Sequence, residues 1–516
     1  MLSISEGLAG QARQRPDQFA LVCGETRVSY AEFDRRVDAA SHLLWGLGVR
    51  PGDRVVTLLP NGLTATELLF AAARSGAVIC PLNPRSTPAE LAYLLTDAGP
   101  RVVVGVPPVL EAAAAALPEG VRVIADLPPG DPRPGYARMR DDAGSGPFPP
   151  QVGEDAPWLL VYTSGTTGRP KGALRSQRSD YLMGLMLAPA VGIGPDDVGL
   201  AWMPLFHVNS IWMVTLSICI GTTCHIHAPA RFQPAALLAD LDRSGATYSM
   251  FVPSVMGYLA DALEQDQVRC AGLRVLMTSS APLPPVLRDR LLTALPSAQL
   301  VEIYGATEIG AATMERHVRG QAGGTIGFAV PGVRVRLLGP DRRPVEPGQP
   351  GELFVESPQV MSGYFGRPAD TEAARAGAYV GVGDLAVQDG SGRLRLVDRL
   401  ADTIITSGEN VYPTEVESVL LAHPAVALAA VIGVPDERRG EAVVAAVLCR
   451  PGQSVTAAGL AAHCRAHLAP HKCPRSIAFA TELPLSLTGK VLRRRVRELW
   501  REGAFMPQAA QPAPTA

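Results

Sequence analysis

The spacing of hydrophobic residues alternates between two periods along the first 150 positions. Ala31–Trp45 and Ala65–Ser75 carry apolar residues at helical spacing, whereas Arg54–Leu59 and Ala77–Leu82 are β-rich apolar runs. Strands that alternate with helices predict a largely parallel sheet covered on both faces. The alternation resumes between Ser179 and Thr313, so the sequence predicts an α/β fold with two parallel-sheet subdomains.

The period of the pattern changes after Gly332. Val333–Leu338 alternates with period two, and Glu352–Glu356 and Arg393–Val397 are further short strands between Gly- and Pro-rich turns. This pattern predicts a small antiparallel β-barrel. We place a domain boundary near Asp398–Asp402, so that residues 1–399 form a large N-terminal domain.

The remainder of the chain reads as a smaller α+β domain, residues 400–500. Its predicted helices are Pro413–Ala422 and Val455–Leu468, and its predicted strands are Val426–Val434 and Ala442–Cys449. Residues 501–516 are rich in Pro, Ala and Gln, so we expect a disordered tail.

Composition narrows the class of protein. At 516 residues, with 47% hydrophobic and 19% charged residues, the chain is typical of a globular protein of two or more domains. A net charge of -2 gives no electrostatic footprint for nucleic acid or an anionic membrane. No signal peptide is apparent, and the apolar run Ile211–Ile220 is too short to span a bilayer, so it predicts a buried helix.

The eight cysteines are scattered and favour a reduced, cytoplasmic compartment. The tightest group, Cys219 and Cys224 with His225 and His227, matches no usual zinc spacing. We therefore expect core packing there rather than a metal site.

One stretch, Val161–Gly172, combines glycines, hydroxyls and a lysine. Glycine allows close backbone approach, and successive N–H groups in such a turn bind anions. Pro170 precedes Lys171, so the stretch is not a Walker loop, which ends in Gly-Lys-Ser/Thr. A flexible linker is the alternative. The candidate phosphate-binding residues are Thr163, Ser164, Gly165, Thr166, Thr167, Gly168 and Lys171.

The order of residues in this stretch resembles the phosphate loop of the adenylate-forming superfamily, which includes acyl-CoA synthetases, nonribosomal adenylation domains and luciferases. Four further motifs and two shorter matches follow in the family's order, so the resemblance covers nearly the whole chain. The overall likeness is to crotonobetaine/carnitine and medium-chain acyl-CoA ligases. The resemblance implies a mobile C-terminal domain, with ATP, Mg²⁺ and coenzyme A as cofactors.

The second motif, at Tyr304, Gly305, Thr307 and Glu308, follows an apolar run that reads as a strand. Its glycine turn delivers Thr307 and Glu308 to the C-terminal edge of a parallel sheet, where α/β proteins bind ligands. Mg²⁺ is held by one or two carboxylates plus substrate phosphates, so Glu308 fits a magnesium ligand.

The remaining roles are implied by the resemblance. Asp384 would accept hydrogen bonds from the ribose hydroxyls of ATP, assisted by Arg399. The turn Ser280-Ala281-Pro282 would enclose the adenine, and His207 would be an aromatic gate beside the acyl pocket. The turn Ser407-Gly408-Glu409 would lie beside the pantetheine arm of coenzyme A.

Lys490 resembles the family's catalytic lysine for adenylation. Attack of a carboxylate on the α-phosphate builds charge on equatorial oxygens, which a lysine stabilises electrostatically. For Arg493, Arg494, Arg495 and Arg497 we expect a solvated basic helix face instead.

The sequence departs from the family pattern at a few positions. Ser279, Ser280, Ser210 and Ser407 replace common glycines, which puts the pocket shape and the pantetheine tunnel in question. Ala401 takes the hinge position, usually Asp or Lys, so we expect a shifted balance between the two half-reactions.

These matches predict an AMP-forming acyl-CoA synthetase. Transfer to a carrier protein or an amine, a luciferase-type oxidation and a catalytically silent ATP-binding module are the alternatives. His207–Met213 together with Val252–Tyr258 suggests a pocket for a medium-sized, mainly apolar acid, with Asn209, Ser210, Ser254 and Trp212 as polar contacts. We expect a carboxylic acid and coenzyme A as partners, no nucleic acid or membrane, and a homodimer.

Overall fold

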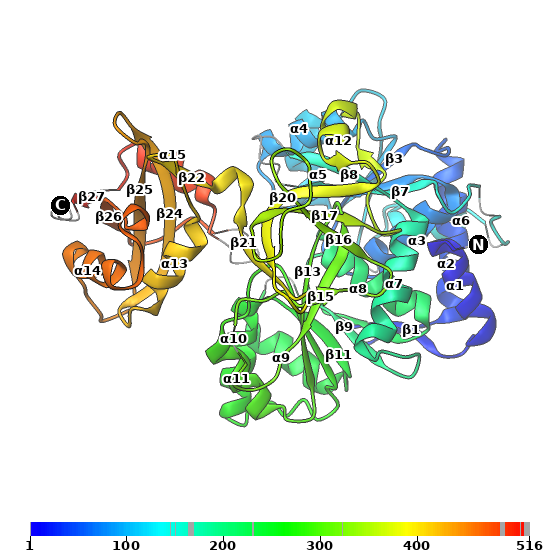
Figure 1. Cartoon of the computed structure of the whole chain (residues 1–516). Coiled ribbons are helices and arrows are strands. Elements are labelled where there is room, and N and C mark those ends of the chain that lie inside the picture. Colours follow the sequence, from blue (N-terminus) through cyan, green and yellow to red (C-terminus); the bar gives the residue numbers. More distant parts are fainter. Residues whose placement is uncertain are drawn as a thin grey trace. The chain divides into compact units, whose positions relative to one another are not determined.

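The computed structural model describes residues 2–128, 130–144, 146–149, 151–163, 170–229, 232–321, 323–485, 491–505 and 507–509 (Figure 1). Two compact units are separated by their internal contacts. The first comprises residues 1–335 and 355–382, and the second comprises residues 336–354 and 383–516. The boundary expected at residues 399–400 stays a prediction.

The first unit contains most of the helices. They are α1 (Ile4–Gln14), α2 (Tyr30–Gly46), α3 (Leu63–Ser75), α4 (Pro88–Ala98), α5 (Pro107–Ala113) with η1 (Ala114–Ala116), α6 (Tyr136–Asp142), α7 (Gln177–Val191), α8 (Val208–Ile220), α9 (Pro234–Arg243), α10 (Pro253–Glu264), α11 (Pro285–Ala294) and α12 (Pro368–Ala373).

A nine-stranded sheet carries much of the candidate site. Its central strands are parallel, and antiparallel strands lie at both edges. In spatial order the strands are β15 (Phe328–Ala329), β14 (Gly310–Arg316), β13 (Gln299–Ala306), β12 (Val275–Thr278), β11 (Tyr248–Phe251), β9 (Val198–Ala201), β10 (Thr223–Ile226), β1 (Phe19–Cys23) and β2 (Thr26–Ser29).

A seven-stranded sheet is built in the same way. Its strands β4, β3, β5, β6 and β7 pair in parallel, and β8 and β18 add an antiparallel edge. In spatial order the strands are β18 (Gly363–Tyr364), β8 (Lys171–Ser176), β7 (Pro157–Thr163), β4 (Val78–Pro81), β3 (Arg54–Leu58), β5 (Val102–Gly105) and β6 (Arg122–Ala125). The predicted pair of parallel-sheet subdomains is confirmed.

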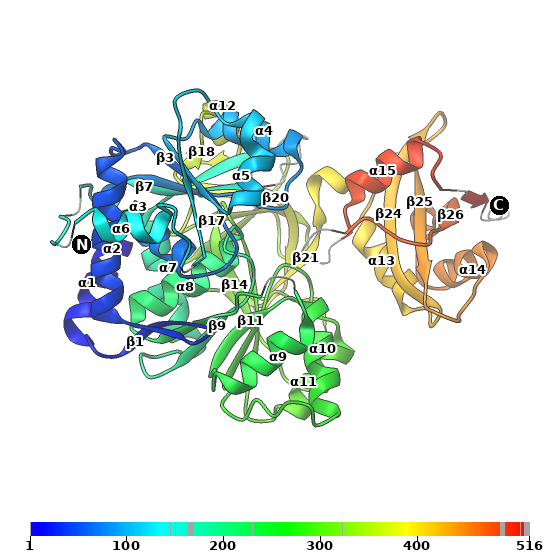
Figure 2. The ribbon, with the colours of Figure 1, turned by 180° about the vertical axis from the view of Figure 1, so that it is seen from behind.

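Helices fill three layers around these two sheets (Figures 1 and 2). The largest core joins inner residues of both sheets to α1, α2, α3, α7 and α8. The helices α9, α10 and α11 cover the other face of the nine-stranded sheet, and α4 and α5 cover the other face of the seven-stranded sheet. Neighbouring residues of one strand face different layers, as Met277 and Leu276 of β12 do, because side chains alternate along a strand.

The apolar run that ends α8 is the predicted buried helix. Both Cys219 at its end and Cys224 on β10 pack in the main core, so the prediction of core packing is confirmed. Burial raises the pKa of the Cys224 thiol to about 12, so the thiol stays protonated. None of the described helices is long and apolar enough to cross a membrane.

The strands expected as a small barrel form a five-stranded sheet. Its order is β16 (Arg334–Leu338), β17 (Gly351–Glu356), β20 (Tyr379–Gln388) and β19 (Arg375–Ala376), with β21 (Leu394–Arg399) paired to β20. A short 3₁₀ turn, η2 (Leu400–Asp402), follows β21 and contains Ala401.

The C-terminal part of the second unit has its own sheet. Its order is β23 (Glu409–Val411), β22 (Ile404–Thr406), β25 (Gly440–Cys449), β26 (Ser476–Phe479) and β27 (Pro507–Ala509), with β24 (Val426–Asp436) paired to β25. Its helices are α13 (Pro413–Ala422), α14 (Ala457–His467), η3 (Pro470–Lys472) and α15 (Arg493–Arg501). The predicted α+β content is confirmed. Within the expected disordered tail, Pro507–Ala509 pair instead with the edge strand β26, whose open edge offers backbone partners.

Alternating residues of β24 serve two cores in this unit. Val431 packs toward α13 and α14, whereas Ile432 packs toward Val496 of α15. This places α13 and α14 on one face of the sheet and α15 on the other (Figures 1 and 2).

Candidate active site

The two ends of the candidate phosphate loop are held by a strand pair. Thr163 ends β7, Lys171 begins β8, and the two residues are partners in the antiparallel register. Ser164, Gly165, Thr166, Thr167 and Gly168 lie outside the described residues. Their role in holding phosphates stays a prediction.

Glu308 lies in the turn between β13 and β14 and is 8% exposed. Its Oε1 accepts hydrogen bonds from Thr163 Oγ1 at 3.1 Å and from Tyr364 Oη at 3.0 Å. Burial and the Glu308 charge raise the pKa of Tyr364 far above its usual value, so its hydroxyl remains a donor. The acid of the second motif is thereby joined to the start of the phosphate loop.

Lys171 lies next to this group on β8. Its Nζ forms an ion pair with Asp370 Oδ1 at 2.7 Å and lies 5.4 Å from the centre of the Tyr364 ring. Strand β18 brings Tyr364 beside β8, where it pairs with Ala173. Neither Tyr364 nor Asp370 was found by sequence reasoning. The sequence signal for this contact is the short segment Gly363–Pro368, which contains two glycines and a proline.

Two turns meet at the C-terminal edge of the nine-stranded sheet. Ser280, Ala281 and Pro282 follow β12, and Thr307 follows β13, the parallel neighbour of β12. Gly305 permits a close approach there, because a Cβ on it would lie 2.1 Å from the Gly310 carbonyl oxygen. Tyr304 is buried on β13.

A cavity of about 60 Å³ opens beside these turns. Exposed Gly305 and part-buried Ser280 and Asn209 lie at its mouth. Its other lining residues are buried, and most are apolar: Met183, Leu187, Trp212, Met213, Leu216, Met250, Ser279, Ile303 and Ala311.

The polar groups of this cavity are mostly engaged. Asn209 Nδ2 donates to Ser279 Oγ at 2.9 Å and to Ser280 Oγ at 3.2 Å. The Trp212 indole N–H donates to Asp180 rather than into the cavity. Asn209 and Trp212 line the cavity, but the expected polar contact of Trp212 is wrong, because Asp180 accepts its N–H. The role of the cavity as the acid pocket stays a prediction. The lining does not include Val252–Tyr258, because Val252 caps α10 and the other residues belong to this helix, which covers the other face of the sheet.

His207 forms the N-terminal cap of α8 and does not line this cavity. Its ring lies 5.1 Å from the Phe206 ring. Burial lowers the pKa of His207, so the imidazole is neutral, and its Nε2 has no hydrogen-bond partner among the described residues. Its role as a gate stays a prediction.

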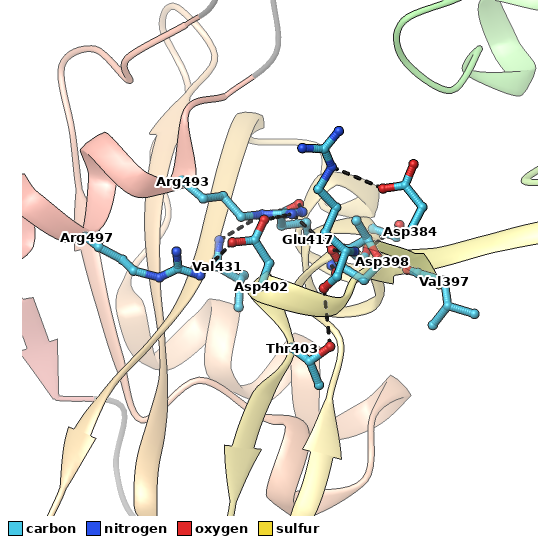
Figure 3. Close-up of polar contacts among 12 residues, drawn as sticks. Asp384, Val397, Asp398, Asp402, Thr403, Glu417, Val431, Arg493 and Arg497 are labelled. Atoms are coloured by element: carbon cyan, nitrogen blue, oxygen red, sulfur yellow. Dashed lines mark hydrogen bonds and ion pairs between the residues drawn. The ribbon is translucent and has the colours of Figure 1, made fainter. Parts of the chain in front are cut away.

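Asp384 and Arg399 come together in the second unit. They are register partners on β20 and β21, and Arg399 Nε lies 3.1 Å from Asp384 Oδ1 (Figure 3). Asp384 is 8% exposed, whereas the Arg399 side chain is 47% exposed, so the carboxylate is buried and the guanidinium reaches solvent. The ribose contact that we expect of both residues stays a prediction.

The expected basic face after Lys490 is wrong for Arg493. Its guanidinium contacts Glu417 at 2.6 Å, Asp398 at 3.1 Å and Asp402 at 3.2 Å (Figure 3). These acids come from α13, β21 and η2, so tertiary packing surrounds the Arg493 side chain and leaves it 15% exposed. Arg497 also pairs with Asp402, whereas Arg494 and Arg495 stay largely exposed and pair with Glu498 on the same helix. Lys490 itself lies outside the described residues.

Ser407 and Gly408 form the two-residue turn between β22 and β23. Their φ values are +53° and +83°, and Thr406 pairs with Glu409 across the turn. A hairpin turn of this kind needs left-handed residues, a conformation that glycine adopts at lower cost than Ser407 does. Contact of Ser407, Gly408 and Glu409 with coenzyme A stays a prediction.

We expect Ser407→Gly to stabilise the second unit by about 0.5–1 kcal/mol, because a side chain in the left-handed region costs roughly 1 kcal/mol or more. The midpoint of thermal unfolding measures this change. Gly408→Ala is the control of opposite sign and is expected to lower the midpoint. A lower midpoint in Ser407→Gly would contradict the assignment of strain to this residue.

Two family models match successive parts of the chain. The family model for AMP-binding enzymes matches residues 8–365, and the model for the AMP-binding enzyme C-terminal domain matches residues 415–490. A feruloyl-CoA synthase of Amycolatopsis sp is 37% identical over 490 residues, which cover 94% of this chain and 97% of that protein.

Two further relatives extend the comparison. The fatty acid–[acyl-carrier-protein] ligase ScoC of Streptomyces coeruleorubidus is 32% identical over 511 residues, with 96% of each chain covered. The ATP-bound crystal structure of MatB from Rhodopseudomonas palustris has a TM-score of 0.88 at 30% identity, covering 97% of this chain and 99% of that one. The chain therefore belongs to the AMP-binding enzyme family, the adenylate-forming superfamily that its motifs resemble.

Proposed function

We propose that this chain joins a largely apolar carboxylic acid to coenzyme A, and that the acid carries no charge besides its reacting carboxylate. The relatives include CoA ligases for feruloyl, sulfoacetate and long-chain fatty acyl groups. The chain is accordingly an AMP-forming acid–thiol ligase, which makes an acyl-adenylate from ATP and then a thioester. The acid and the residue roles are the parts that we propose.

The cavity in the first unit is the observation that carries the choice of acid. All of its lining residues are uncharged, and its buried part is formed largely by Met, Leu and Ile side chains. An acid with a second charged group, besides its reacting carboxylate, would place that group against this wall. The placement costs several kcal/mol of free energy, because no partner replaces the water that the charge loses. The methionines are flexible, so the cavity can enlarge around an apolar body of varied shape.

The proposed roles follow the motifs. Thr163–Lys171 would hold the β- and γ-phosphates, with Ser280, Ala281, Pro282, Tyr304 and Gly305 near the base. Asp384 and Arg399 would hold the ribose. Lys490 would act at the α-phosphate, and Ser407, Gly408 and Glu409 would contact coenzyme A.

Glu308 fits a magnesium ligand. It is a buried carboxylate whose protein hydrogen bonds, among the described residues, reach Oε1. The described part of the chain contains no group of three or more His, Cys, Asp or Glu side chains that could hold a metal. Mg²⁺ typically takes most of its ligands from phosphate and water, and when bound it would neutralise phosphate charge.

Because all eight cysteines are free thiols, we also propose a cytoplasmic location.

A screen of free acids with ATP and coenzyme A tests the proposal. Pyrophosphate release and thioester mass are measured for neutral aryl and alkyl acids and for dicarboxylates and sulfonates of matched length. We expect kcat/KM at least about a hundredfold higher for the neutral acids, the ratio that corresponds to roughly 3 kcal/mol. A preference for the doubly charged acids would overturn the choice of acid.

The acceptor is tested in the same assay. Coenzyme A is replaced by a carrier protein that bears phosphopantetheine, the acceptor class named for ScoC. We expect faster transfer to coenzyme A. Faster loading of the carrier would support the alternative, and the absence of pyrophosphate release with every acid would reject the ligase function itself.

A further inference from the structure

A fully buried ion pair joins strand β8 to α7, the helix whose Met183 and Leu187 line the cavity. Arg175 on β8 and Asp180 on α7 have 0% side-chain exposure, and Arg175 Nη2 lies 2.5 Å from Asp180 Oδ1. Removing either partner of a buried pair leaves an uncompensated charge. The pair therefore holds β8 and α7 together.

The remaining donors of Arg175 reach main-chain oxygens at the candidate site. Nη1 donates to the carbonyl oxygen of Thr307 at 2.6 Å, and Nη2 donates to that of Gln359 at 2.9 Å. Thr307 immediately precedes Glu308 in the turn after β13. The segment of Gln359 is joined to the same turn, because the Met361 N–H donates to the Glu308 carbonyl oxygen at 2.8 Å.

Asp180 extends this contact to the wall of the cavity. Its Oδ1 accepts the indole N–H of Trp212 at 3.0 Å, and its Oδ2 accepts that of Trp158 at 2.9 Å. The Arg175 guanidinium also lies 5.1 Å from the centre of the Trp212 ring. The ring that lines the cavity is thus held by one hydrogen bond and one cation–π contact.

We propose that Arg175 is a positioning residue for adenylation, which holds the Thr307–Glu308 turn directly and the Trp212 wall of the cavity through Asp180. This inference rests on the proposed function. On this proposal one guanidinium fixes how two groups lie relative to each other. These are the Glu308 carboxylate, which would bind the metal, and the Trp212 wall, which would contact the acid.

The geometry of arginine explains the choice of residue. Its planar guanidinium presents five N–H donors in a fixed fork, so it can serve one carboxylate and two carbonyls together. A lysine keeps the charge, yet its single ammonium cannot span all three acceptors. Arg175→Lys should therefore leave the Thr307 carbonyl or Asp180 without its partner.

The experiment compares Arg175→Lys with Arg74→Lys. Arg74 is also buried in the first unit, where it contacts Asp34 at 2.5 Å, Asp38 at 2.7 Å and the Asp34 carbonyl, but it does not line the cavity. Both variants are assayed by acid-dependent pyrophosphate exchange, with activity referred to the folded fraction. Thermal unfolding gives the stability of each.

We expect both variants to unfold at lower temperature. For Arg175→Lys alone we expect about a tenfold rise in the KM for the acid and about a tenfold fall in kcat, the size found when a group that orients a functional residue is removed. Equal kinetic constants in the two variants would overturn the inference, since a structural role affects only the folded fraction. A wild-type protein that activates no acid would instead reject the proposed function.

A second pair carries the test if Arg175→Lys does not fold. Trp212→Phe and Trp158→Phe each remove one indole N–H that Asp180 accepts, but only Trp212 lines the cavity. A KM for the acid raised in Trp212→Phe and unchanged in Trp158→Phe supports the inference. The same KM in both variants contradicts it.

Discussion

Glu308→Gln is expected to lower the rate of acyl-adenylate formation by about a hundred- to a thousandfold, the range for loss of one preorganised electrostatic group. The amide keeps the shape of the side chain and an oxygen that can accept from Thr163 and Tyr364. The negative charge is lost, so affinity for Mg²⁺ should fall. Pyrophosphate exchange measured across Mg²⁺ concentrations checks both effects.

Glu302→Gln is the matched control for this prediction. Glu302 lies on β13, the strand that precedes the turn of Glu308. It is 7% exposed, and its Oε2 contacts His317 Nε2 at 2.9 Å. Because side chains alternate along β13, Glu302 faces away from the cavity side on which Ile303 and Gly305 lie. We expect its exchange rate to stay within a factor of about three of wild type. A Glu308→Gln rate in that range would contradict the metal role.

Lys490→Ala is expected to reduce adenylation by a similar factor, about a hundred- to a thousandfold, because we propose that this lysine stabilises the charge built on the α-phosphate. The transfer of a supplied acyl-adenylate to coenzyme A should be affected far less, since in that step the thiol attacks the acyl carbon and not the α-phosphorus. Quenched-flow measurement of each half-reaction separates the two steps.

The composition of the chain makes this a clean experiment. Only three of its 47 basic residues are lysines, namely Lys171, Lys472 and Lys490. Lys472 pairs with Glu415 at 2.7 Å in the second unit, so Lys472→Ala is the control for loss of a lysine charge there. Equal adenylation rates in Lys490→Ala and Lys472→Ala would remove the basis for the proposed catalytic role.

Hydrophobic spacing predicted the elements that are decided locally. Pro413–Ala422 is a helix as predicted, and Ala31–Trp45 lies within α2. Val455–Leu468 is shortened to Ala457–His467, because the Thr456 side chain caps the helix start. The sequence also predicted that the second motif lies in a turn after a strand. A glycine followed by polar residues after an apolar run is a local signal for such a turn.

The sequence analysis did not predict contacts between segments that are far apart in the chain. Arg493 reads as a solvated residue in a basic run, yet acids from three other elements surround it. Tyr364 and Asp370 reach Glu308 and Lys171 through the pairing of β18 with β8. Val252–Tyr258 follows a strand that borders the cavity, but its helix packs on the opposite face of the sheet.

The family, the helix and strand periods and the motifs that indicate the chemistry can all be recognised in the amino-acid sequence, because each is a pattern of neighbouring residues. Tertiary structure alone decided which charges are buried, what Arg175 and Arg493 hold, and which side chains line the cavity. Those properties depend on pairing between segments far apart in the chain. A burial or a hydrogen bond of this kind has no signature in local spacing, since the partner can come from any element that the fold brings near.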